Sequence, residues 1–370
     1  MTNTKIPEFT LNFTEMYYAI KLAIASGNVP LVLSQPGIGK SALAKKYAKD
    51  HNLYLIDFRA AGADITDFTG LPAFDHQLKI AMFMTFDTFP TKNTPLPKHA
   101  DGTPYSGWLL FFDEVTNSPM PIQHALYKIF YDRMVGHAYL HDQVQLMGAG
   151  NRAEDLSGVE TLSTALLSRV TKLTMKSDVT VWSDWALQNV IQSVYAYIQY
   201  SPTSLNNFNA EKVSETNSAF ACERSWEKVS NTLKTQESLN APEKALTANV
   251  LGTIGKEEGS TFMSFLSIYK ELPSLDLIYS APDTAPLPDK GRKDMFLALT
   301  IKLALQVTQE NVDNTMQYIL RFPEEFQVKF VKTATQVGTQ EEQKTRRDII
   351  KFTEGFKHIT KVVSSLSDKY

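Results

Sequence analysis

The sequence predicts an α/β fold in which a parallel five-stranded sheet is flanked by helices and followed by helical regions. Apolar segments typical of buried strands alternate with helical segments up to about residue 177. From residue 181 onward, the apolar residues recur at helical spacing. Residues 281–289 are rich in proline and have the composition of a linker. We therefore expect an α/β core over residues 1–177, a helical domain over 178–281 and a helical C-terminal region over 290–370.

Composition sets limits on the class of protein. The 370 residues are 43 % hydrophobic and 21 % charged, which is ordinary for a globular protein. The net charge of −3 does not indicate a dedicated nucleic-acid-binding protein, although it does not exclude local basic patches. The single cysteine, Cys222, excludes an internal disulfide. Residues 1–10 are polar, and no apolar segment approaches membrane-spanning length, so we expect a cytoplasmic protein without a membrane partner.

The elements of the core follow one another in a regular order. Met16, Ile20 and Ala23 recur at helical spacing, and Gly27 ends that helix. Strands are expected at residues 29–33, 53–58, 109–112, 144–149 and 171–175. Helices are expected at residues 14–26, 41–50, 121–131 and 163–168, with a hairpin at 134–144. Helices beyond the core are expected at residues 182–200, 224–233, 241–254, 261–269, 293–306, 311–320 and 341–365.

One region of the core departs from this alternation, at about residues 64–107. Residues 78–89 alternate between apolar and polar positions, which predicts a short strand or hairpin. Residues 90–107 are rich in proline, glycine and lysine and predict a long exposed loop. We interpret Phe83, Phe86 and Phe89 as core residues, with the lining of a pore as the alternative.

A turn with two glycines follows the first strand, in the segment LVLSQPGIGKS at residues 31–41. Glycines let the chain bend so that backbone N–H groups and the start of a helix face phosphate oxygens. Lys40 would reach the β- and γ-phosphates, and the Ser41 hydroxyl would bind Mg²⁺. Contacts to nucleotide are therefore expected from Pro36, Gly37, Ile38, Gly39, Lys40, Ser41 and Ala42. Ser34 stands where the consensus has glycine, and a plain glycine turn with a solvated lysine is the alternative.

Polar residues follow two further strands. Asp113 and Glu114 end the apolar run at 109–112, where Asp113 could serve Mg²⁺ and Glu114 could orient an attacking water. Asn151 follows the strand at 144–149 and could reach the γ-phosphate or the water if that strand lies between the other two. The simpler alternatives are a pair of solvated acids and an asparagine that satisfies a turn.

Two arginines could stabilise charge on the transferred phosphoryl group. Arg169 ends the short helix at 163–168, and Arg224 begins a helix in the second domain. The alternative is that both are ordinary surface residues. His137 and His141 have no third ligand nearby in the sequence, so no metal site is predicted there.

Taken as an ordered set, these motifs resemble AAA+ ATPases of the MoxR branch over residues 14 to about 280. The resemblance is carried by residues 35–41 and by DFTGLP (67–72), FFDE (111–114), GAGNR (148–152), ALLSR (165–169), WSDWA (182–186) and RSWE (224–227). It implies that Lys40 and Ser41 belong to Walker A, and that Asp113 and Glu114 form Walker B. It also implies that Asn151 is sensor 1, Arg169 an arginine finger given in trans, and Arg224 sensor 2 in a helical lid. Arg133, after the helix at 121–131, resembles a further arginine of the family, which implies either a second contact in trans or a plain surface role.

The same resemblance implies a function. It is Mg²⁺-dependent ATP hydrolysis by a hexameric ring that remodels a protein client, such as a von Willebrand A-domain protein. Residues 64–89 would then be the insertion that faces the pore of the ring. ATP is preferred over GTP by resemblance only. Two alternatives stay open: a nucleic-acid-directed motor or loader on the same core, and a nucleotide-gated scaffold with little turnover.

Overall fold

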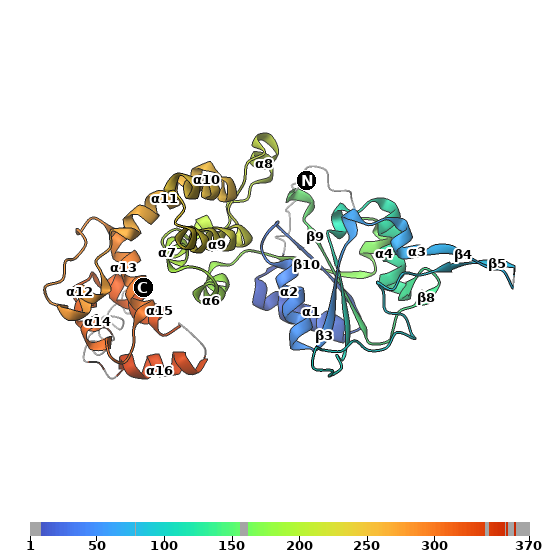
Figure 1. The fold of residues 1–370 in the computed structure, drawn as a ribbon, viewed down its shortest axis with the longest axis horizontal. Helices are drawn as coiled ribbons and strands as arrows, with labels where there is room; N and C mark the ends of the chain where they lie inside the picture. Colours follow the sequence, from blue (N-terminus) through green and yellow to red (C-terminus); the bar gives the residue numbers. More distant parts are fainter. Residues whose placement is uncertain are drawn as a thin grey trace, which may run out of the picture. The chain divides into compact units, whose positions relative to one another are not determined.

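A computed structural model describes residues 9–77, 79–155, 162–336, 340–351, 353 and 359. The chain forms two compact units (Figure 1). The first comprises Met1–Asp178 with Asn209–Glu215, and the second comprises Val179–Phe208 with Thr216–Tyr370.

The first unit is built on a parallel sheet of six strands in the order β1-β10-β2-β9-β6-β3. The strands are β1 (Thr10–Leu11), β2 (Val29–Ser34), β3 (Leu53–Arg59), β6 (Gly107–Asp113), β9 (Val144–Asn151) and β10 (Val170–Met175). All five predicted strands are present, and the α/β fold class is confirmed. The predicted count of five is corrected to six, because β1 pairs with the edge of β10 over two residues, too few to show a periodicity.

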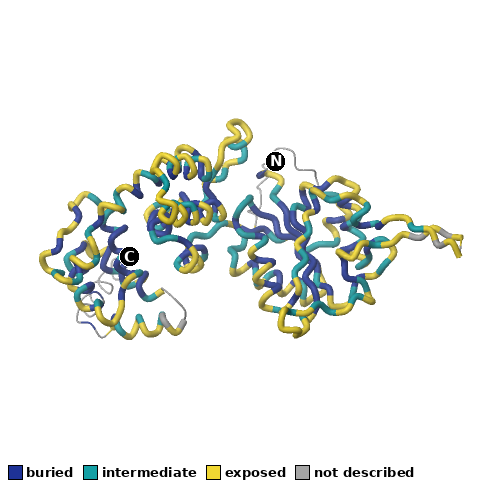
Figure 2. Tube along the Cα trace, viewed as in Figure 1, coloured by how far each residue is buried: buried dark blue, intermediate teal, exposed yellow. Residues whose placement is uncertain are grey.

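Helices cover both faces of this sheet (Figures 1 and 2). On one face, α1 (Phe13–Ala25) and α2 (Lys40–Asp50) pack against Val32 and Phe111. On the other face, α4 (Met120–Asp132) packs against Leu31, Leu33 and Phe112. Successive residues of a strand point to opposite faces, so strands such as β2 and β6, which are buried along their whole length, supply both cores.

Short elements connect the strands. They are η1 (Ala60–Gly62), α3 (Ile65–Thr69), η2 (Val115–Asn117), β7 (Met134–Val135), β8 (Ala138–Tyr139), η3 (Ala153–Asp155) and α5 (Thr164–Leu167). The hairpin expected at 134–144 is present as β7 and β8, which pair antiparallel. The helix expected at 163–168 is present as α5.

An antiparallel hairpin projects from the first unit, formed by β4 (Leu71–Asp75) and β5 (Ile80–Met84). It starts earlier than the predicted segment at 78–89, and Leu78 itself lies outside the described residues. Gly70 makes this start possible: it has φ +80°, and a Cβ there would lie 2.2 Å from the Met84 carbonyl oxygen. The hairpin lies in the exposed part of the trace in Figure 2, with Phe74 73 % exposed.

The second unit is helical. Its elements are α6 (Val179–Asn189), α7 (Gln192–Tyr200), η4 (Pro202–Leu205), α9 (Glu223–Leu239), α10 (Glu243–Ile254), α11 (Lys256–Lys270), α12 (Leu275–Ser280), α13 (Lys293–Gln306), α14 (Val312–Ile319), α15 (Glu324–Ala334) and α16 (Gln340–Lys351). The helix α8 (Ala210–Thr216) lies mostly in the segment grouped with the first unit. A single helix was predicted over 182–200, but Ile191 is extended and separates α6 from α7. The Ile191 N–H donates to Ser230 Oγ at 2.8 Å, so this backbone group has a hydrogen-bond partner although the helix is interrupted.

One hydrophobic cluster of the second unit runs from Trp182 to Ile359, with Tyr197, Trp226 and Phe262 among its largest buried side chains. Helices on both sides of the predicted linker contribute to this cluster, and the division into a lid and a C-terminal region stays a prediction. Of the last predicted helix, residues 352, 354–358 and 360–365 lie outside the described part. Within the described residues, no helix has the length and apolar character needed to cross a bilayer.

Candidate nucleotide-binding site

The strand order brings the carboxyl ends of β2, β9 and β6 together at one edge of the sheet. Strand β9 lies between the other two, with Asn151 opposite Ser34 and Gly148 opposite Phe112. This is the arrangement on which the predicted role of Asn151 depended. Ligands of open parallel sheets bind outside the carboxyl ends of the strands, so this edge is the candidate site.

The glycine turn after β2 leads directly into α2. Gly37 and Gly39 have φ of +83° and +103°, a conformation that side chains with a Cβ rarely adopt. Gly39 is the N-cap of α2 and has no side chain that could cap the helix. The N–H groups of the first turn therefore point out of the helix towards the loop, an arrangement suited to an anion.

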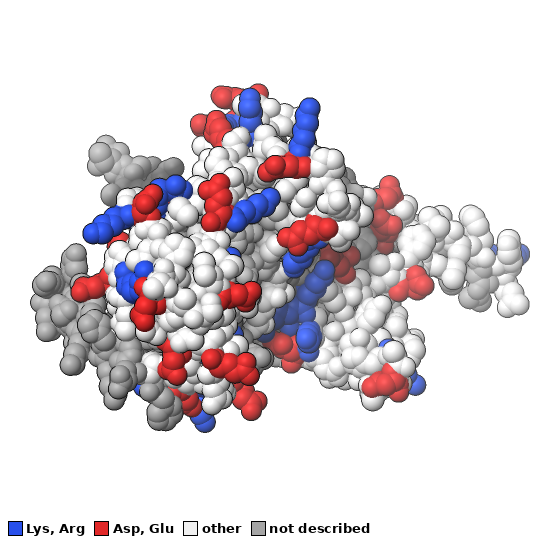
Figure 3. Space-filling view, turned by 60° about the vertical axis from the view of Figure 1, so that its left-hand side comes forward, with Lys and Arg blue, Asp and Glu red and all other residues white. Residues whose placement is uncertain are grey.

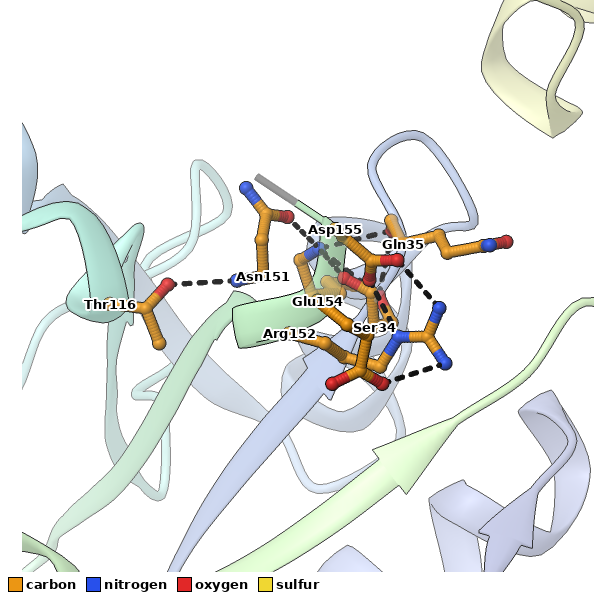
Figure 4. A network of polar contacts seen from close by, with 8 residues as sticks. Ser34, Gln35, Thr116, Asn151, Arg152, Glu154 and Asp155 are labelled. Atoms are coloured by element: carbon orange, nitrogen blue, oxygen red, sulfur yellow. Dashed lines mark hydrogen bonds and ion pairs between the residues drawn. The ribbon is translucent and has the colours of Figure 1, made fainter. Parts of the chain in front are cut away.

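Lys40 is buried, and its ammonium lies at the centre of a polar cluster. Its Nζ donates to Asn151 Oδ1 at 2.8 Å and to Ser34 Oγ at 3.0 Å. It also lies 3.3 Å from the carbonyl oxygens of Ser34 and Gln35. Ser34, which replaces the consensus glycine, thus contributes an acceptor for the lysine. Figure 4 shows Ser34, Gln35 and Asn151 converging from the ends of β2 and β9.

Ser41 and Asp113 meet across α2 and β6. Ser41 Oγ donates to Asp113 Oδ2 at 3.1 Å, and Asp113 is buried. A hydroxyl and a carboxylate are hard oxygen donors of the kind that Mg²⁺ prefers in nucleotide sites, usually with waters completing its shell. The donor set therefore fits Mg²⁺ held by Ser41 and Asp113.

Glu114 follows β6 in a left-handed conformation, with φ 60° and ψ 30°. Its N–H donates to Asp113 Oδ1 at 2.9 Å, and its carboxylate Oε1 lies 3.1 Å from Arg59 Nη1. A non-glycine residue in this conformation stores strain, which is commonest at functional sites. The backbone thus turns immediately after Asp113, and Arg59 holds the carboxylate that follows.

Asn151 is held from its backbone side by Thr116. The Asn151 N–H donates to Thr116 Oγ1 at 2.9 Å, and Thr116 is buried in η2, two residues after Glu114. Gly150 allows this approach, because a Cβ there would lie 2.6 Å from Thr116 Cγ2. The end of β9 is therefore tied to the segment that carries the two acids (Figure 4).

An ion-pair network follows Asn151. Arg152 donates from Nε and Nη2 to the two oxygens of Asp155, both at 2.6 Å, and Asp155 is buried. Arg152 also pairs with the exposed Glu154 at 3.4 Å. A bidentate pair of this geometry fixes the turn at the end of β9 (Figure 4).

Arg169 lies at the opposite end of β2 from this group. Arg169 directly precedes Val170, which pairs with Val29 at the start of β2. The glycine turn, by contrast, follows the end of β2. The length of β2, roughly 17 Å at 3.3 Å per residue, separates Arg169 from the loop of its own chain. Arg224 is exposed near the start of α9 in the second unit. The structure thus brings together Lys40, Ser41, Asp113, Glu114 and Asn151, and it places Arg169 at the other end of β2.

Other sequence interpretations are resolved by the packing. Arg133 donates to the Val144 carbonyl at 2.6 Å, and burial lowers the pKa of its guanidinium. It therefore stabilises the start of β9 rather than lying free on the surface. Phe89 is a core residue as predicted, but Phe83 and Phe86 are exposed. No group of three or more potential metal-ligating His, Cys, Asp or Glu residues occurs in the part of the chain that the structure describes.

Sequence reasoning missed Arg59 and Thr116. Arg59 follows directly on the predicted strand at 53–58, so its place at a strand terminus was a usable signal. Thr116 carried no such signal, because its partner Asn151 is 35 positions away in the sequence.

The strand order, the glycine loop and the converging polar side chains define an α/β fold of the P-loop type, followed by a helical part. No protein-family model matches the chain, and no curated protein matches it either.

Solved structures do match. A variant of RuvB from Thermotoga maritima is 14 % identical over 73 % of this chain and 78 % of its own, with a TM-score of 0.36. A second variant of the same protein is 14 % identical over 83 % of this chain and 85 % of its own, with a TM-score of 0.35. A candidate ATPase from Cytophaga hutchinsonii is 16 % identical over 71 % and 75 %, with a TM-score of 0.32. The fold assignment rests on the topology and the loop rather than on these superpositions.

Proposed function

We propose that this chain is a Mg²⁺-dependent ATPase of the MoxR type that assembles into a ring and remodels a protein partner. The observation that carries the proposal is the convergence of Lys40, Asn151, Ser41 and Asp113 at the end of three neighbouring parallel strands. The Lys40–Asn151 and Ser41–Asp113 contacts of 2.8 and 3.1 Å place a cation, an amide and two metal-type donors beside one helix N-terminus.

Each side chain has a role that follows from its chemistry. Lys40 supplies positive charge to the phosphates, and the acceptors from Ser34 and Gln35 keep its ammonium aimed at the loop. Bound Mg²⁺ would neutralise charge on the phosphate oxygens. Asp113 would bind the Mg²⁺ ion together with Ser41. Glu114 would orient the attacking water by accepting a hydrogen bond from it.

The placement of Arg169 supports its action on a neighbouring subunit. It lies at the opposite end of β2 from its own phosphate loop, so it can complete a nucleotide site only on another copy. Hydrolysis would then depend on how two subunits meet, and loss of the γ-phosphate would alter that interface. Arg224, near the start of a lid helix, would contact the nucleotide of its own chain.

The β4–β5 hairpin supports a protein client. Leu71, Phe74, Phe83 and Met84 are exposed on it, and the charged residues between positions 71 and 86 are Asp75 and Lys79 near the turn. Among the described residues of the projecting segment in Figure 3, most are neither acidic nor basic, whereas both kinds are interspersed over the rest of that face. Exposed apolar surface of this kind is typical of protein-binding sites.

Calorimetry of Mg·ATP binding tests the nucleotide site. Wild type is expected to bind with measurable heat, and Lys40→Ala to lose it while circular dichroism shows a folded protein. Glu114→Gln is expected to bind Mg·ATP but to hydrolyse it at least about 100-fold more slowly. The absence of binding heat for folded wild type would refute the proposal. A parallel titration with GTP shows whether the site prefers ATP or GTP.

The client assignment is tested with the hairpin. Phe74→Ser and Phe83→Ser should abolish capture of a protein by the Glu114→Gln variant without changing basal ATPase activity. Phe9→Ser is the matched control, because Phe9 is also exposed but lies outside the hairpin. Stimulation of ATPase activity by DNA or RNA, with no protein captured, would instead identify a nucleic-acid-directed motor.

A further inference from the structure

We propose that Tyr127 and Tyr131 of α4 are positioning residues that hold the Arg169 guanidinium ready for the nucleotide site of a neighbouring subunit. The proposal rests on the function proposed above, because it concerns how Arg169 is presented in that reaction.

The two tyrosines form a platform under the arginine. They lie four residues apart on α4 and so share one face of the helix, with ring centroids 6.1 Å apart and planes 24° from parallel. Arg169 Cζ lies 4.5 Å from the centroid of Tyr131 and 5.1 Å from that of Tyr127. Arg169 Nη2 also donates to the Tyr127 hydroxyl at 3.2 Å, and Nη1 donates to Ser168 Oγ.

The backbone of Arg169 is already fixed. Its N–H donates to the Leu166 carbonyl at 3.0 Å, and the next residue, Val170, is paired with Val29 in the sheet. What remains variable is the long side chain, which has more rotamer freedom than almost any other. The tyrosine platform removes that freedom before two subunits meet, so the interface does not have to supply the ordering.

The contact is not explained by stability alone. Tyr131 is 61 % exposed, and a cation–π contact at an exposed site contributes little to folding. Arg169 Nε is buried and finds no hydrogen-bond partner among the described residues, a loss that a purely structural arginine would avoid. The arrangement gives up a hydrogen bond but fixes the direction of the guanidinium.

Steady-state ATPase kinetics distinguish positioning from packing. Tyr131→Leu is expected to lower kcat about tenfold and to leave KM for ATP within about twofold, because Arg169 acts in the transition state. Tyr131→Phe keeps the ring and should restore kcat to within about twofold of wild type. Tyr127→Phe loses only the hydroxyl contact and should lower kcat about threefold. Tyr139→Leu is the matched control and should leave kcat unchanged. Tyr139 is 53 % exposed and also makes a cation–π contact, with Lys92 Nζ 5.1 Å from its ring centroid.

Double variants and mixed subunits complete the test. Tyr131→Leu should add no further loss to Arg169→Ala, because the tyrosine acts through the arginine. Subunits with Tyr131→Leu, mixed with Glu114→Gln subunits, should regain activity, since each supplies what the other lacks at a shared site.

The failures of the two proposals are distinguishable. An unchanged kcat in Tyr131→Leu and Tyr127→Phe, or an additive loss in the double variant, overturns the positioning role and leaves the ATPase proposal intact. Normal kcat in Arg169→Ala overturns the finger and its platform together, while Glu114-dependent hydrolysis still stands. A folded wild type that binds no Mg·ATP overturns both.

Discussion

The Arg59 guanidinium, at the end of β3, lies 3.1 Å from the carboxylate of Glu114, which directly follows β6. The pairing of β3 with β6 sets Arg59 opposite Asp113, so the register of the sheet delivers the arginine to this position. Both side chains are exposed, by 61 % and 40 %. Such a pair contributes only about 0–1 kcal/mol to stability. Its main effect is therefore to set the direction in which the Glu114 carboxylate points.

Arg59→Ala is therefore expected to raise basal ATPase activity by up to about fivefold. In the function proposed above, Glu114 has to leave Arg59 before it can orient water. Removing a restraint of up to about 1 kcal/mol would lower the barrier by that amount. Added salt should raise the wild-type rate and leave the variant rate unchanged. Lys46→Ala, which removes a comparably exposed ion pair with Asp50, is the control. A fall in turnover as deep as that of Glu114→Gln would contradict this account.

Thr116→Val is expected to loosen the end of β9. The isosteric change removes the acceptor for the half-buried Asn151 N–H, and the loss of one such hydrogen bond costs about 0.5–1.5 kcal/mol. Hydrogen exchange at the Asn151 amide should accelerate, and ATP turnover should fall because the Asn151 side chain is no longer fixed. Thr116→Ser keeps the hydroxyl and should retain most of the protection. Equal protection in the valine and serine variants would show that this hydrogen bond is unimportant.

Gly150→Ala is expected to destabilise the first unit by about 1–3 kcal/mol. The added Cβ would lie 2.6 and 2.7 Å from Thr116 Cγ2 and Oγ1, both on a buried side chain that the hydrogen bond from the Asn151 N–H holds in place. Gly252→Ala is the matched control in α10, where a Cβ meets nothing within 4 Å, and it should stabilise by about 0.5–1 kcal/mol. Urea unfolding measures both changes, and a neutral Gly150→Ala would mean that the chain can separate β9 from η2 at no cost.

Lys302→Met is expected to stabilise the second unit at neutral pH by up to about 1 kcal/mol. Burial lowers the pKa of Lys302, which lies 6.0 Å from the Tyr269 ring centroid, so the folded state holds the charged form at a cost. Between the folded-state pKa and about 10.5, the unfolded chain binds the proton and the folded chain does not, so the free energy of unfolding rises with pH.

The free energy of unfolding of Lys302→Met should not show this rise with pH. The difference in stability between the variant and wild type should therefore shrink as the pH approaches 10. Urea unfolding at several pH values measures the effect. Lys293→Met, on the same helix but exposed and paired with Glu325 at 3.3 Å, is the control. An advantage for Lys302→Met that stays constant with pH would assign the gain to packing rather than to the buried charge.

Much of the fold could be predicted because its signals are local. Apolar runs such as 109–112 are buried on both faces of the sheet, and the glycines of the phosphate loop mark a turn that other residues cannot form. Asp113 and Asn151 could be placed beside Lys40 because parallel strands end at one edge of a sheet. The break at Ile191 was not predictable, since Val190 and Ile191 continue the apolar pattern of a helix.

The remainder depends on contacts between distant residues. The Arg59–Glu114 pair requires the register of β3 on β6, and the tyrosines under Arg169 belong to a helix about 40 positions earlier. Phe83 and Phe86 were expected in the core because exposed aromatic residues are uncommon, and the structure exposes both. Sequence patterns indicate which residues are apolar, but only the three-dimensional arrangement shows which of them lack a neighbour.

Strand β9 also has a consequence for how this chain is made. Lys40 and Asn151 are 111 positions apart, and β9 must enter between β2 and β6, both of which are synthesised earlier. Until it does, a nascent chain carries two largely apolar strands whose facing edges have no partner, and such late, non-local pairing is slow and prone to aggregation. We therefore expect these edges to stay unpaired in a nascent chain until β9 has emerged, and β10 to close the other side of β2 only after about residue 175.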